Sequence, residues 1–273
     1  MSSRVAIIAG AGRFPFHVAM EAKRQGLSVV AMGIQGWADP SLAEQVDAYE
    51  EIAVGQLGKL IGRLKSHDVH QAVMAGKVTK AVLLDPRTAF DVEALGILRQ
   101  ARELSVGTLL GAIGQRLASD GITLMDPSTF LQHSLCPLGV FTSRRPTAVE
   151  EADVQLGIRA ARQLASLDIG QTVVVKRGVI VAVEALEGTD AAIRRAHALA
   201  DGDLVVVKMA SPDQDRRFDL PVVGTETITI LRECRASCLA MEAQTALLLD
   251  RETLLACANA ANLCLLGVAA PSA

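Results

Sequence analysis

The 273-residue sequence has few aromatic side chains and no large excess of charge of either sign. Aromatic residues make up 3% of the chain, whereas 50% of it is hydrophobic. The core must therefore be built mainly from Val, Leu, Ile and Ala. The formal net charge is -3. Because nucleic-acid-binding proteins usually carry a basic excess, this balance argues against a nucleic-acid partner.

Long apolar runs and paired cysteines are also lacking. No run approaches the roughly 18 apolar residues that a membrane-spanning helix needs, and the apolar start at Val5–Ala9 is too short for a secretory signal. The five cysteines form no Cys-x-x-Cys pair, which disfavours a zinc site. We expect a soluble, cytoplasmic protein with buried cysteines in a reducing compartment, and peripheral membrane contact remains open.

Strand-like and helix-like segments alternate along the first half of the chain. The apolar spacing predicts strands over 4–9, 27–32, 71–75 and 122–125, and helices over 15–24, 56–66, 91–104 and 108–119. Such alternation implies a parallel sheet covered on both faces. We therefore predict a Rossmann-like N-terminal domain over 1–133.

The alternation lapses over 134–147, where Pro and Gly interrupt it, and we expect a linker there. A second α/β domain then spans 148–273. It begins with a helix over 148–166, followed by β-branched runs over 171–176 and 179–185 that predict a hairpin. Later segments predict β-α crossovers, so we expect a mixed sheet. We expect Thr189 or Asp190, Thr225 and Asp250 to cap helices in this domain.

Gly10-Ala-Gly12 follows the first predicted strand and invites a dinucleotide-binding interpretation. The full fingerprint needs a third small residue where this chain has Pro15, and an acidic residue at the end of the second strand, which is absent. NAD and FAD are therefore disfavoured. A helix N-terminus that meets a phosphate or nucleotide group remains open, as does a tight turn without a ligand.

Other isolated polar residues give weaker signals. Gly76-Lys77 follows a predicted strand without the spacing of an ATP-binding P-loop. Lys77 is as consistent with a phosphate contact as with a solvated surface lysine. His67 and His70 stand one helical turn apart, but at a predicted helix end, which favours a solvated turn. No Ser or Cys has a local signature of a positioned base.

Two apolar runs of the second domain each end in a burst of charge. The acidic members are Glu184, Glu187, Asp190, Asp213, Asp215 and Asp219, and the basic members are Lys208, Arg216 and Arg217. Neighbouring strand ends of one sheet would bring both bursts together. Carboxylates beside fixed cations suit a divalent ion and a phosphate ester. The alternative is a set of helix caps and surface ion pairs.

Two stretches are specific enough to indicate a family: Ala182-Val-Glu-Ala-Leu-Glu-Gly-Thr-Asp190 and Asp215-Arg-Arg-Phe-Asp-Leu-Pro-Val-Val-Gly224. With them, the chain resembles the UDP-2,3-diacylglucosamine pyrophosphatases of lipid A biosynthesis. The resemblance covers nearly the whole chain. It also includes the segments 7–15, 38–42, 55–60, 74–78 and 167–171.

This resemblance implies two α/β domains with the substrate held between them. It implies a divalent ion, usually Mg²⁺, and attack of water on the pyrophosphate of UDP-2,3-diacylglucosamine. The products would be UMP and 2,3-diacylglucosamine 1-phosphate (lipid X). A homodimer and contact with the cytoplasmic face of the inner membrane would fit. The critical aspartate of the family corresponds to Asp219.

We accordingly expect Asp219 to be catalytic, as a metal ligand or as the base for the attacking water. The expected metal ligands are Asp219, Asp215, Glu187 and Asp190. The expected substrate-binding residues are Gly10, Gly12, Lys77, Glu184, Thr189, Arg194, Arg216 and Arg217.

The chain departs from the family pattern at two places. Ser105-Val106-Gly107 stands where family members carry Gly-Asp-Asp, and Asn259–Cys264 replaces an Ala-Asp segment followed by Gly-Leu-Phe. The missing acids motivate a second hypothesis, a relative that binds a nucleotide sugar or lipid without turning it over. A third, a dinucleotide-dependent enzyme, rests only on Gly10 and Gly12.

Overall fold

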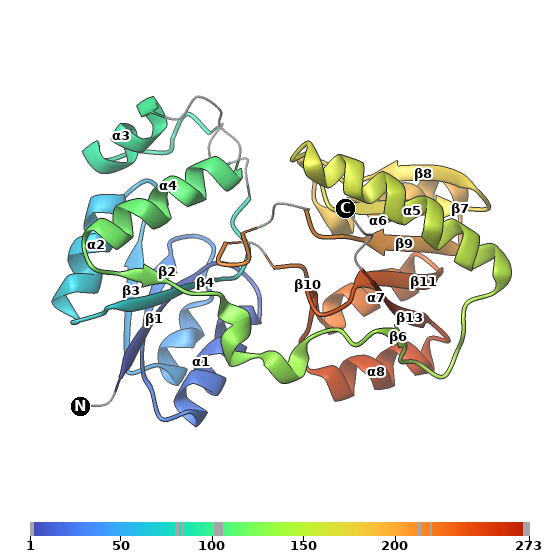
Figure 1. The fold of residues 1–273 in the computed structure, drawn as a ribbon, viewed down its shortest axis with the longest axis horizontal. Coiled ribbons are helices and arrows are strands. Elements are labelled where there is room, and N and C mark those ends of the chain that lie inside the picture. Colours follow the sequence, from blue (N-terminus) through green and yellow to red (C-terminus); the bar gives the residue numbers. More distant parts are fainter. Residues whose placement is uncertain are drawn as a thin grey trace. The chain divides into compact units, whose positions relative to one another are not determined.

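The computed structural model describes residues 3–79, 82, 85–100, 106–211, 215–218 and 220–269. The chain forms two compact units (Figure 1). Unit 1 contains Met1–Gln132 together with Asp215–Asp219, and unit 2 contains His133–Gln214 and Leu220–Ala273. Unit 1 has a parallel sheet and unit 2 a separate mixed sheet. The predicted fold class is therefore confirmed.

The sheet of unit 1 has five parallel strands in the order β3-β2-β1-β4-β5. These strands are β1 (Arg4–Ala9), β2 (Ser28–Ile34), β3 (Ala48–Ile52), β4 (Gln71–Ala75) and β5 (Thr123–Leu124). The central strands β1 and β2 are almost continuously apolar and buried, as expected for strands covered on both faces. The order reverses between β1 and β4, which makes their carboxyl ends the topological switch point.

Helices cover both faces of this sheet, with α1 on one side and α2 and α4 on the other (Figure 1). The helices of unit 1 are α1 (Phe14–Arg24), α2 (Leu57–Ser66), α3 (Val92–Gln100) and α4 (Val106–Ser119), with short 3-10 turns η1 (Pro40–Gln45) and η3 (Pro127–Phe130). Leu57, Leu60, Ile61 and Leu64 of α2 are buried against the strands, so the predicted apolar face of this helix is confirmed.

The sequence prediction omitted β3. Its residues, Ala48-Tyr-Glu-Glu-Ile52, include two glutamates, and four of the five are not buried. The strand lies at the edge of the sheet and pairs with β2 alone. An edge strand can keep polar side chains in water, so it lacks the apolar run that marks a central strand.

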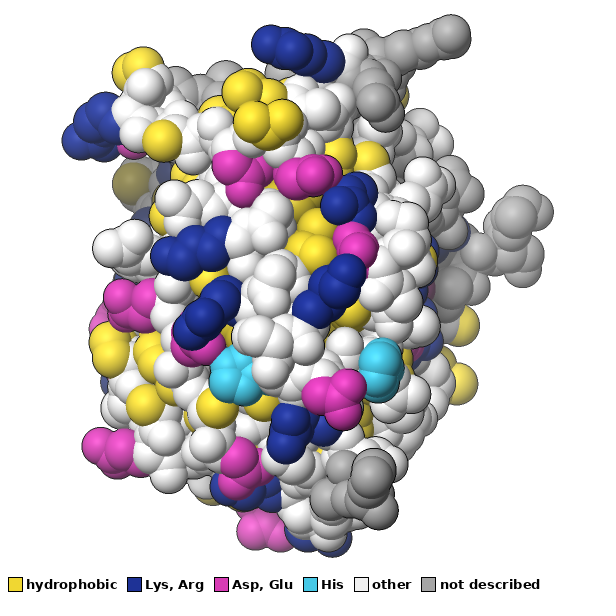
Figure 2. Space-filling view, turned by 90° about the vertical axis from the view of Figure 1, so that its left-hand side faces the viewer, with side chains coloured by type: hydrophobic (Ala, Val, Ile, Leu, Met, Phe, Trp, Pro, Cys, Tyr) yellow, Lys and Arg dark blue, Asp and Glu magenta, His cyan; other side chains and the backbone are white. Residues whose placement is uncertain are grey.

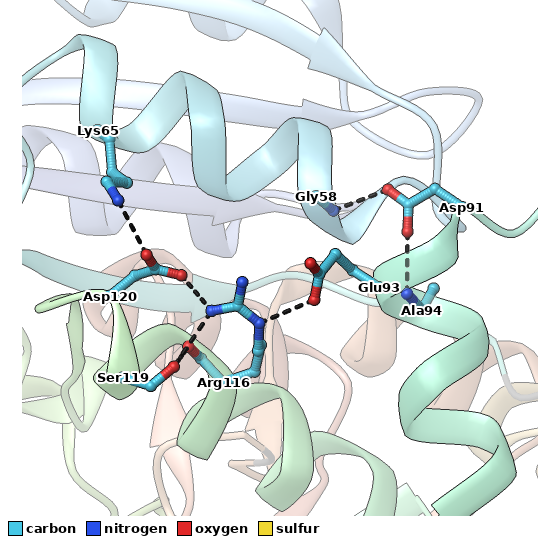
Figure 3. A network of polar contacts seen from close by, with 8 residues as sticks. All are labelled: Gly58, Lys65, Asp91, Glu93, Ala94, Arg116, Ser119 and Asp120. Atoms are coloured by element: carbon cyan, nitrogen blue, oxygen red, sulfur yellow. Dashed lines mark hydrogen bonds and ion pairs between the residues drawn. The ribbon is translucent and has the colours of Figure 1, made fainter.

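Polar contacts tie together the three helices α2, α3 and α4 (Figure 3). The Asp91 carboxylate accepts hydrogen bonds from the backbone N–H groups of Gly58 (2.7 Å) and Ala94 (2.9 Å), at the starts of α2 and α3. Arg116 of α4 donates to Glu93 at 2.8 Å. One aspartate thus satisfies free N–H groups of two helix N-termini, a role that favours negative charge.

Unit 2 is built around a six-stranded sheet in the order β6-β13-β11-β9-β7-β8. Its strands are β6 (Gly139–Val140), β7 (Thr172–Lys176), β8 (Val179–Val183), β9 (Leu204–Lys208), β11 (Ala236–Glu242) and β13 (Cys264–Val268). β7 is antiparallel to both β8 and β9, which confirms the predicted hairpin. Two short strands, β12 (Leu247–Leu248) and β10 (Val222–Val223), pair with each other outside this sheet.

Two apolar clusters pack on this sheet. One includes Val173, Val175, Val205 and Val207 with α5 (Ala148–Ser166). The other includes residues of α6 (Thr189–Ala200), α7 (Thr225–Glu233) and α8 (Arg251–Ala260). Residues 134–147, predicted as a linker, lie within unit 2, where β6 pairs with β13.

Two predicted helix caps are wrong, and the third, Asp250, is right in position only. α6 begins one residue before Asp190, and its N-cap position is Gly188 with φ 84°. α7 likewise begins at Thr225, after Gly224. Asp250 does occupy the N-cap of α8, but its φ of 49° is left-handed and its side chain makes no capping hydrogen bond. A capping side chain needs an extended backbone to reach the N–H groups of the first turn.

The surface and the cysteines fit the composition. Figure 2 shows basic and acidic side chains interspersed on the face that it displays. Four cysteines are buried and Cys257 is exposed, as expected for cysteines that mainly replace small hydrophobic residues. Within the described ranges, we find no helix with both the length and the apolarity needed to cross a membrane.

Candidate functional site

The strand register of unit 2 gathers polar residues at one edge of its sheet. β7 runs antiparallel to its two neighbours, so its first residue lies beside their last residues. Thr172 pairs with Lys208 across β7 and β9. The backbone N–H of Glu184, just after β8, donates to the carbonyl oxygen of Thr172 at 2.8 Å. Three polar side chains therefore start from adjacent backbone positions.

A fourth residue, Thr189 at the start of α6, joins these side chains into one network, which we call the Lys208 cluster (Thr172, Glu184, Thr189 and Lys208). Lys208 Nζ donates to Thr189 Oγ1 at 2.9 Å. Thr189 Oγ1 donates to Glu184 Oε1 at 2.9 Å. The hydroxyl oxygens of Thr172 and Thr189 lie 3.3 Å apart. The cluster thus holds one ammonium and one carboxylate in defined positions.

The charges of the Lys208 cluster support each other. Burial opposes ionisation of Glu184, but the positive charge of Lys208 and the hydroxyls of Thr172 and Thr189 outweigh burial and lower the pKa of its carboxyl group. Glu184 is therefore ionised at neutral pH. A fixed ammonium with hydroxyl groups around it is suited to bind an anionic, hydroxyl-bearing ligand such as a sugar phosphate.

Lys208, the first residue of the second charge burst, joins this cluster, but the described remainder of that burst is not part of the unit 2 sheet. Residues Asp215–Asp219 belong to unit 1. Arg216 Nε lies 3.0 Å from an oxygen of Asp126, and the guanidinium donates to Ser128 Oγ at 3.0 Å. Phe218 packs against the apolar core of unit 1. Asp213 and Asp219 lie outside the described residues.

Two of the three described carboxylates that we expected to bind metal, Asp215 and Glu187, pair with arginines. Arg217 Nε donates to both oxygens of Asp215, at 2.9 and 3.0 Å, and lowers the pKa of that carboxyl group. Arg195 forms an ion pair with Glu187 at 2.6 Å and lowers the pKa of Glu187 in the same way.

Asp190 lies in the first turn of α6, where its negative charge stabilises the positive end of the helix dipole. The part of the chain that the structure describes contains no group of three or more His, Cys, Asp or Glu placed to hold a metal ion. These carboxylates therefore do not by themselves fit Mg²⁺, and the role of Asp219 remains a prediction.

The glycine-rich turn of unit 1 lies at the switch point between β1 and β4. The backbone N–H groups of Ala11 and Lys77 each donate to the carbonyl oxygen of the other, at 2.9 and 3.0 Å. A Cβ on Gly10 would lie 2.8 Å from the Lys77 carbonyl oxygen. Close approach of two backbones accounts for Gly10 without a ligand.

Three further expected substrate-binding residues, Gly12, Lys77 and Arg194, are exposed. Gly12 has φ 93° and open space at the position that a Cβ would take. Lys77 is exposed in unit 1, and Arg194 is exposed on α6 in unit 2. Their proposed phosphate contacts remain predictions.

Sequence reasoning missed two features. Thr172 completes the Lys208 cluster, and the predicted hairpin register already contained the signal, because it places the start of one strand beside the end of the next. Trp37 lines a cavity of unit 1. A lone Trp after a buried strand carries no comparable signal, since the cavity is formed by segments distant in sequence.

Fold and site together define a two-unit α/β protein with a lysine ammonium group held at the edge of one sheet. Comparison with protein families makes this specific. The LpxI N-terminal domain matches residues 4–134, and the LpxI C-terminal domain matches residues 137–266. The chain belongs to the LpxI family.

A curated relative is similar from end to end. The UDP-2,3-diacylglucosamine pyrophosphatase LpxI of Caulobacter vibrioides is 29% identical over 277 residues, which cover 97% of each chain. The expected family is thereby confirmed, and so is the expectation of an enzyme of the hydrolase class, at the level of the family.

Solved structures give much weaker similarity. Phosphoribosylglycinamide synthetase from Anaerococcus prevotii has a TM-score of 0.28 and 10% identity, covering 75% of this chain and 44% of that chain. The biotin carboxylase subunit of pyruvate carboxylase has a TM-score of 0.27 and 15% identity, covering 68% and 39%. This chain matches less than half of either protein, and we base no argument on them.

Proposed function

We propose that the chain hydrolyses the pyrophosphate of UDP-2,3-diacylglucosamine to UMP and 2,3-diacylglucosamine 1-phosphate in lipid A biosynthesis. The observation that carries this proposal is the end-to-end similarity to a pyrophosphatase named for that substrate. Both domain matches belong to the same family, so the similarity is not confined to a shared fold of one unit.

The Lys208 cluster supports a role in binding the phosphorylated sugar. Its ammonium is directed by Thr189, and Glu184 in turn accepts from Thr189. This arrangement would hold the Lys208 charge in place for a phosphate oxygen, and the Thr189 hydroxyl, whose proton goes to Glu184, would accept a further hydrogen bond from a sugar hydroxyl. In the reaction, an oxygen of water bonds to phosphorus while a bridging P–O bond breaks.

We further propose that the reaction needs a divalent ion, with Asp219 as its principal ligand or as the base for the attacking water. When bound, Mg²⁺ would neutralise pyrophosphate charge and lower the pKa of a bound water. Because Asp215 and Glu187 are paired with arginines, we assign them to support rather than to direct metal binding. A homodimer and peripheral contact with the cytoplasmic face of the inner membrane complete the proposal.

The test is hydrolysis of UDP-2,3-diacylglucosamine with Mg²⁺ and with EDTA. The variants are Asp219→Asn and, as a matched control, Glu44→Gln, which changes an exposed carboxylate of unit 1. We expect activity in the wild type and the control, and a loss of about 100-fold or more in Asp219→Asn, beyond the usual effect of losing a supporting group. Full activity of Asp219→Asn would refute the role of this residue.

A departure from the family sequence pattern supports an alternative function, binding of the substrate without hydrolysis. Ser105-Val106-Gly107 lacks both carboxylates of the family motif, so a relative that binds without turnover would retain the substrate. Mass spectrometry of the incubated protein distinguishes the two functions. Intact UDP-2,3-diacylglucosamine bound after long incubation with Mg²⁺ would refute the hydrolase and favour the binding protein.

A further inference from the structure

A cavity of about 320 Å³ lies within unit 1, at the carboxyl ends of β2 and β3. Its walls include Gln35 and Trp37, which follow β2, and Gln56, which follows β3. Arg87 and Thr88 belong to a more distant segment that closes the cavity on the other side. Ligands of open parallel sheets bind outside the carboxyl ends of the strands, and this cavity lies at that edge of the sheet, beside β2 and β3 rather than at the switch point between β1 and β4.

The cavity is held in shape by backbone contacts. Asp91 N–H donates to the Gly55 carbonyl oxygen at 3.0 Å. The Asp91 carboxylate accepts from Gly58 N–H at 2.7 Å, as Figure 3 shows. These bonds join the segment that carries Arg87 and Thr88 to the start of α2. Gly55 is required at this junction because the Ala89 carbonyl oxygen occupies the space of a Cβ. The cavity is therefore formed before any ligand binds.

The lining suits a flat, uncharged ring with several hydrogen-bonding groups. Trp37 is half-buried against the core of unit 1, and its indole supplies a rigid surface for stacking. The amides of Gln35 and Gln56 each offer donors and an acceptor, which match the imide edge of uracil and the hydroxyls of ribose. Arg87 forms an ion pair with Asp85 at 2.7 Å, so the rim carries balanced charge and favours a nucleoside over a bare phosphate.

We infer that this cavity binds the uracil base and ribose of a uridine nucleotide. The inference rests on the proposed function, which supplies a uridine nucleotide as substrate. Gln35 then stands directly after β2, near where dinucleotide-binding folds carry the acidic residue that holds a ribose. This chain lacks that acid, and the neutral side-chain amide of Gln35 would hydrogen-bond the ribose in its place.

The chain reports on this cavity directly, because Trp37 is its only tryptophan. We would titrate the full chain with UMP, AMP and inorganic phosphate while following tryptophan fluorescence, with equilibrium dialysis of labelled UMP in parallel. The variants are Gln35→Ala and, as a matched control, Gln115→Ala, which removes an exposed amide of α4 outside the cavity.

UMP should produce a saturable change in fluorescence at lower concentration than AMP, and phosphate should produce none. Gln35→Ala should weaken UMP binding and raise the KM for UDP-2,3-diacylglucosamine by about 2- to 10-fold, the value of one hydrogen bond, while Gln115→Ala leaves both unchanged. Binding of UMP without a fluorescence change, equal responses to UMP and AMP, or unchanged affinity and KM in Gln35→Ala would each overturn the inference.

The outcome also separates the two proposals. Hydrolysis with no involvement of the cavity would leave the proposed function intact and reject this site. A UMP response at Trp37 in a chain that hydrolyses no UDP-2,3-diacylglucosamine would reject the function and retain a uridine-nucleotide site.

Discussion

At the scale of single residues, Lys208 and Glu184 depend on each other. The Glu184 carboxylate is largely buried and stays ionised because Lys208 and two threonine hydroxyls favour its charged form. Removing a partner from such a pair costs more than the pair contributes, since the remaining charge is left in a site that disfavours it.

Lys208→Met should therefore destabilise unit 2 by about 1–3 kcal/mol at neutral pH, the range for losing a hydrogen bond to a charged group. The pKa of Glu184 is lowered in the folded wild type, so its ionisation stabilises the fold above the unfolded value of about 4.3. That contribution is lost as the pH falls through the folded pKa. The deficit of the variant should thus shrink near pH 4.

Hydrogen exchange measured by mass spectrometry on peptides from the unit 2 sheet, wild type against variant at pH 7 and pH 4, checks this prediction. A deficit of equal size at both pH values would mean that Lys208 acts through packing of its aliphatic chain and not through Glu184.

At the scale of elements, the close contact between the ends of β1 and β4 determines where the chain requires a glycine. Gly10 lies against the Gly76–Lys77 backbone, whereas Gly62, in the middle of α2, has open space in the position that a Cβ would take. The two glycines look alike in sequence, but a methyl group has room at Gly62 and not at Gly10.

Gly10→Ala should destabilise unit 1 by about 1–3 kcal/mol, because the neighbouring backbone cannot give way without strain. Gly62→Ala should stabilise it by about 0.5–1 kcal/mol, since Ala loses less backbone entropy in a helix. Thermal unfolding of both variants measures the two effects. Equal shifts of the same sign would contradict the close backbone packing at the switch point.

At the scale of the whole molecule, the chain contributes to unit 1 twice. Residues 204–211 belong to unit 2, yet Asp215–Asp219 belong to unit 1, and the chain then returns to unit 2 at Leu220. Phe218 packs this segment against unit 1. Its ring lies 3.1 Å from the position that a Cβ on Gly114 of α4 would take.

Phe218→Ala should therefore lower the free energy of unfolding of unit 1 by about 1–3 kcal/mol, which is the contribution of burying a large apolar side chain. Hydrogen exchange should accelerate in α4 and β5 and remain unchanged in α5 and β7, although Phe218 is closer in sequence to unit 2. Val92→Ala, which removes an exposed apolar side chain of unit 1, is the matched control and should leave both units unaffected. Faster exchange confined to unit 2 would contradict the assignment of this segment.

The sequence by itself determined the fold class, most of the strands and helices, and the family. Apolar runs such as Arg4–Ala9 and Gln71–Ala75 mark buried strands through local composition, and the helix over Ala148–Ser166 has matching boundaries in sequence and structure. It did not reveal β3, because an edge strand is partly polar, or the helix caps, because capping depends on backbone angles that composition does not encode.

Only the tertiary structure decided which charges meet. The strand register placed Thr172 and Lys208 side by side, while Asp215 and Glu187 form ion pairs with arginines. Packing of Phe218 drew the second acidic segment into unit 1. The cavity at Trp37 likewise needs three chain segments at once. Contacts between residues distant in sequence depend on strand order and packing, which local patterns do not specify.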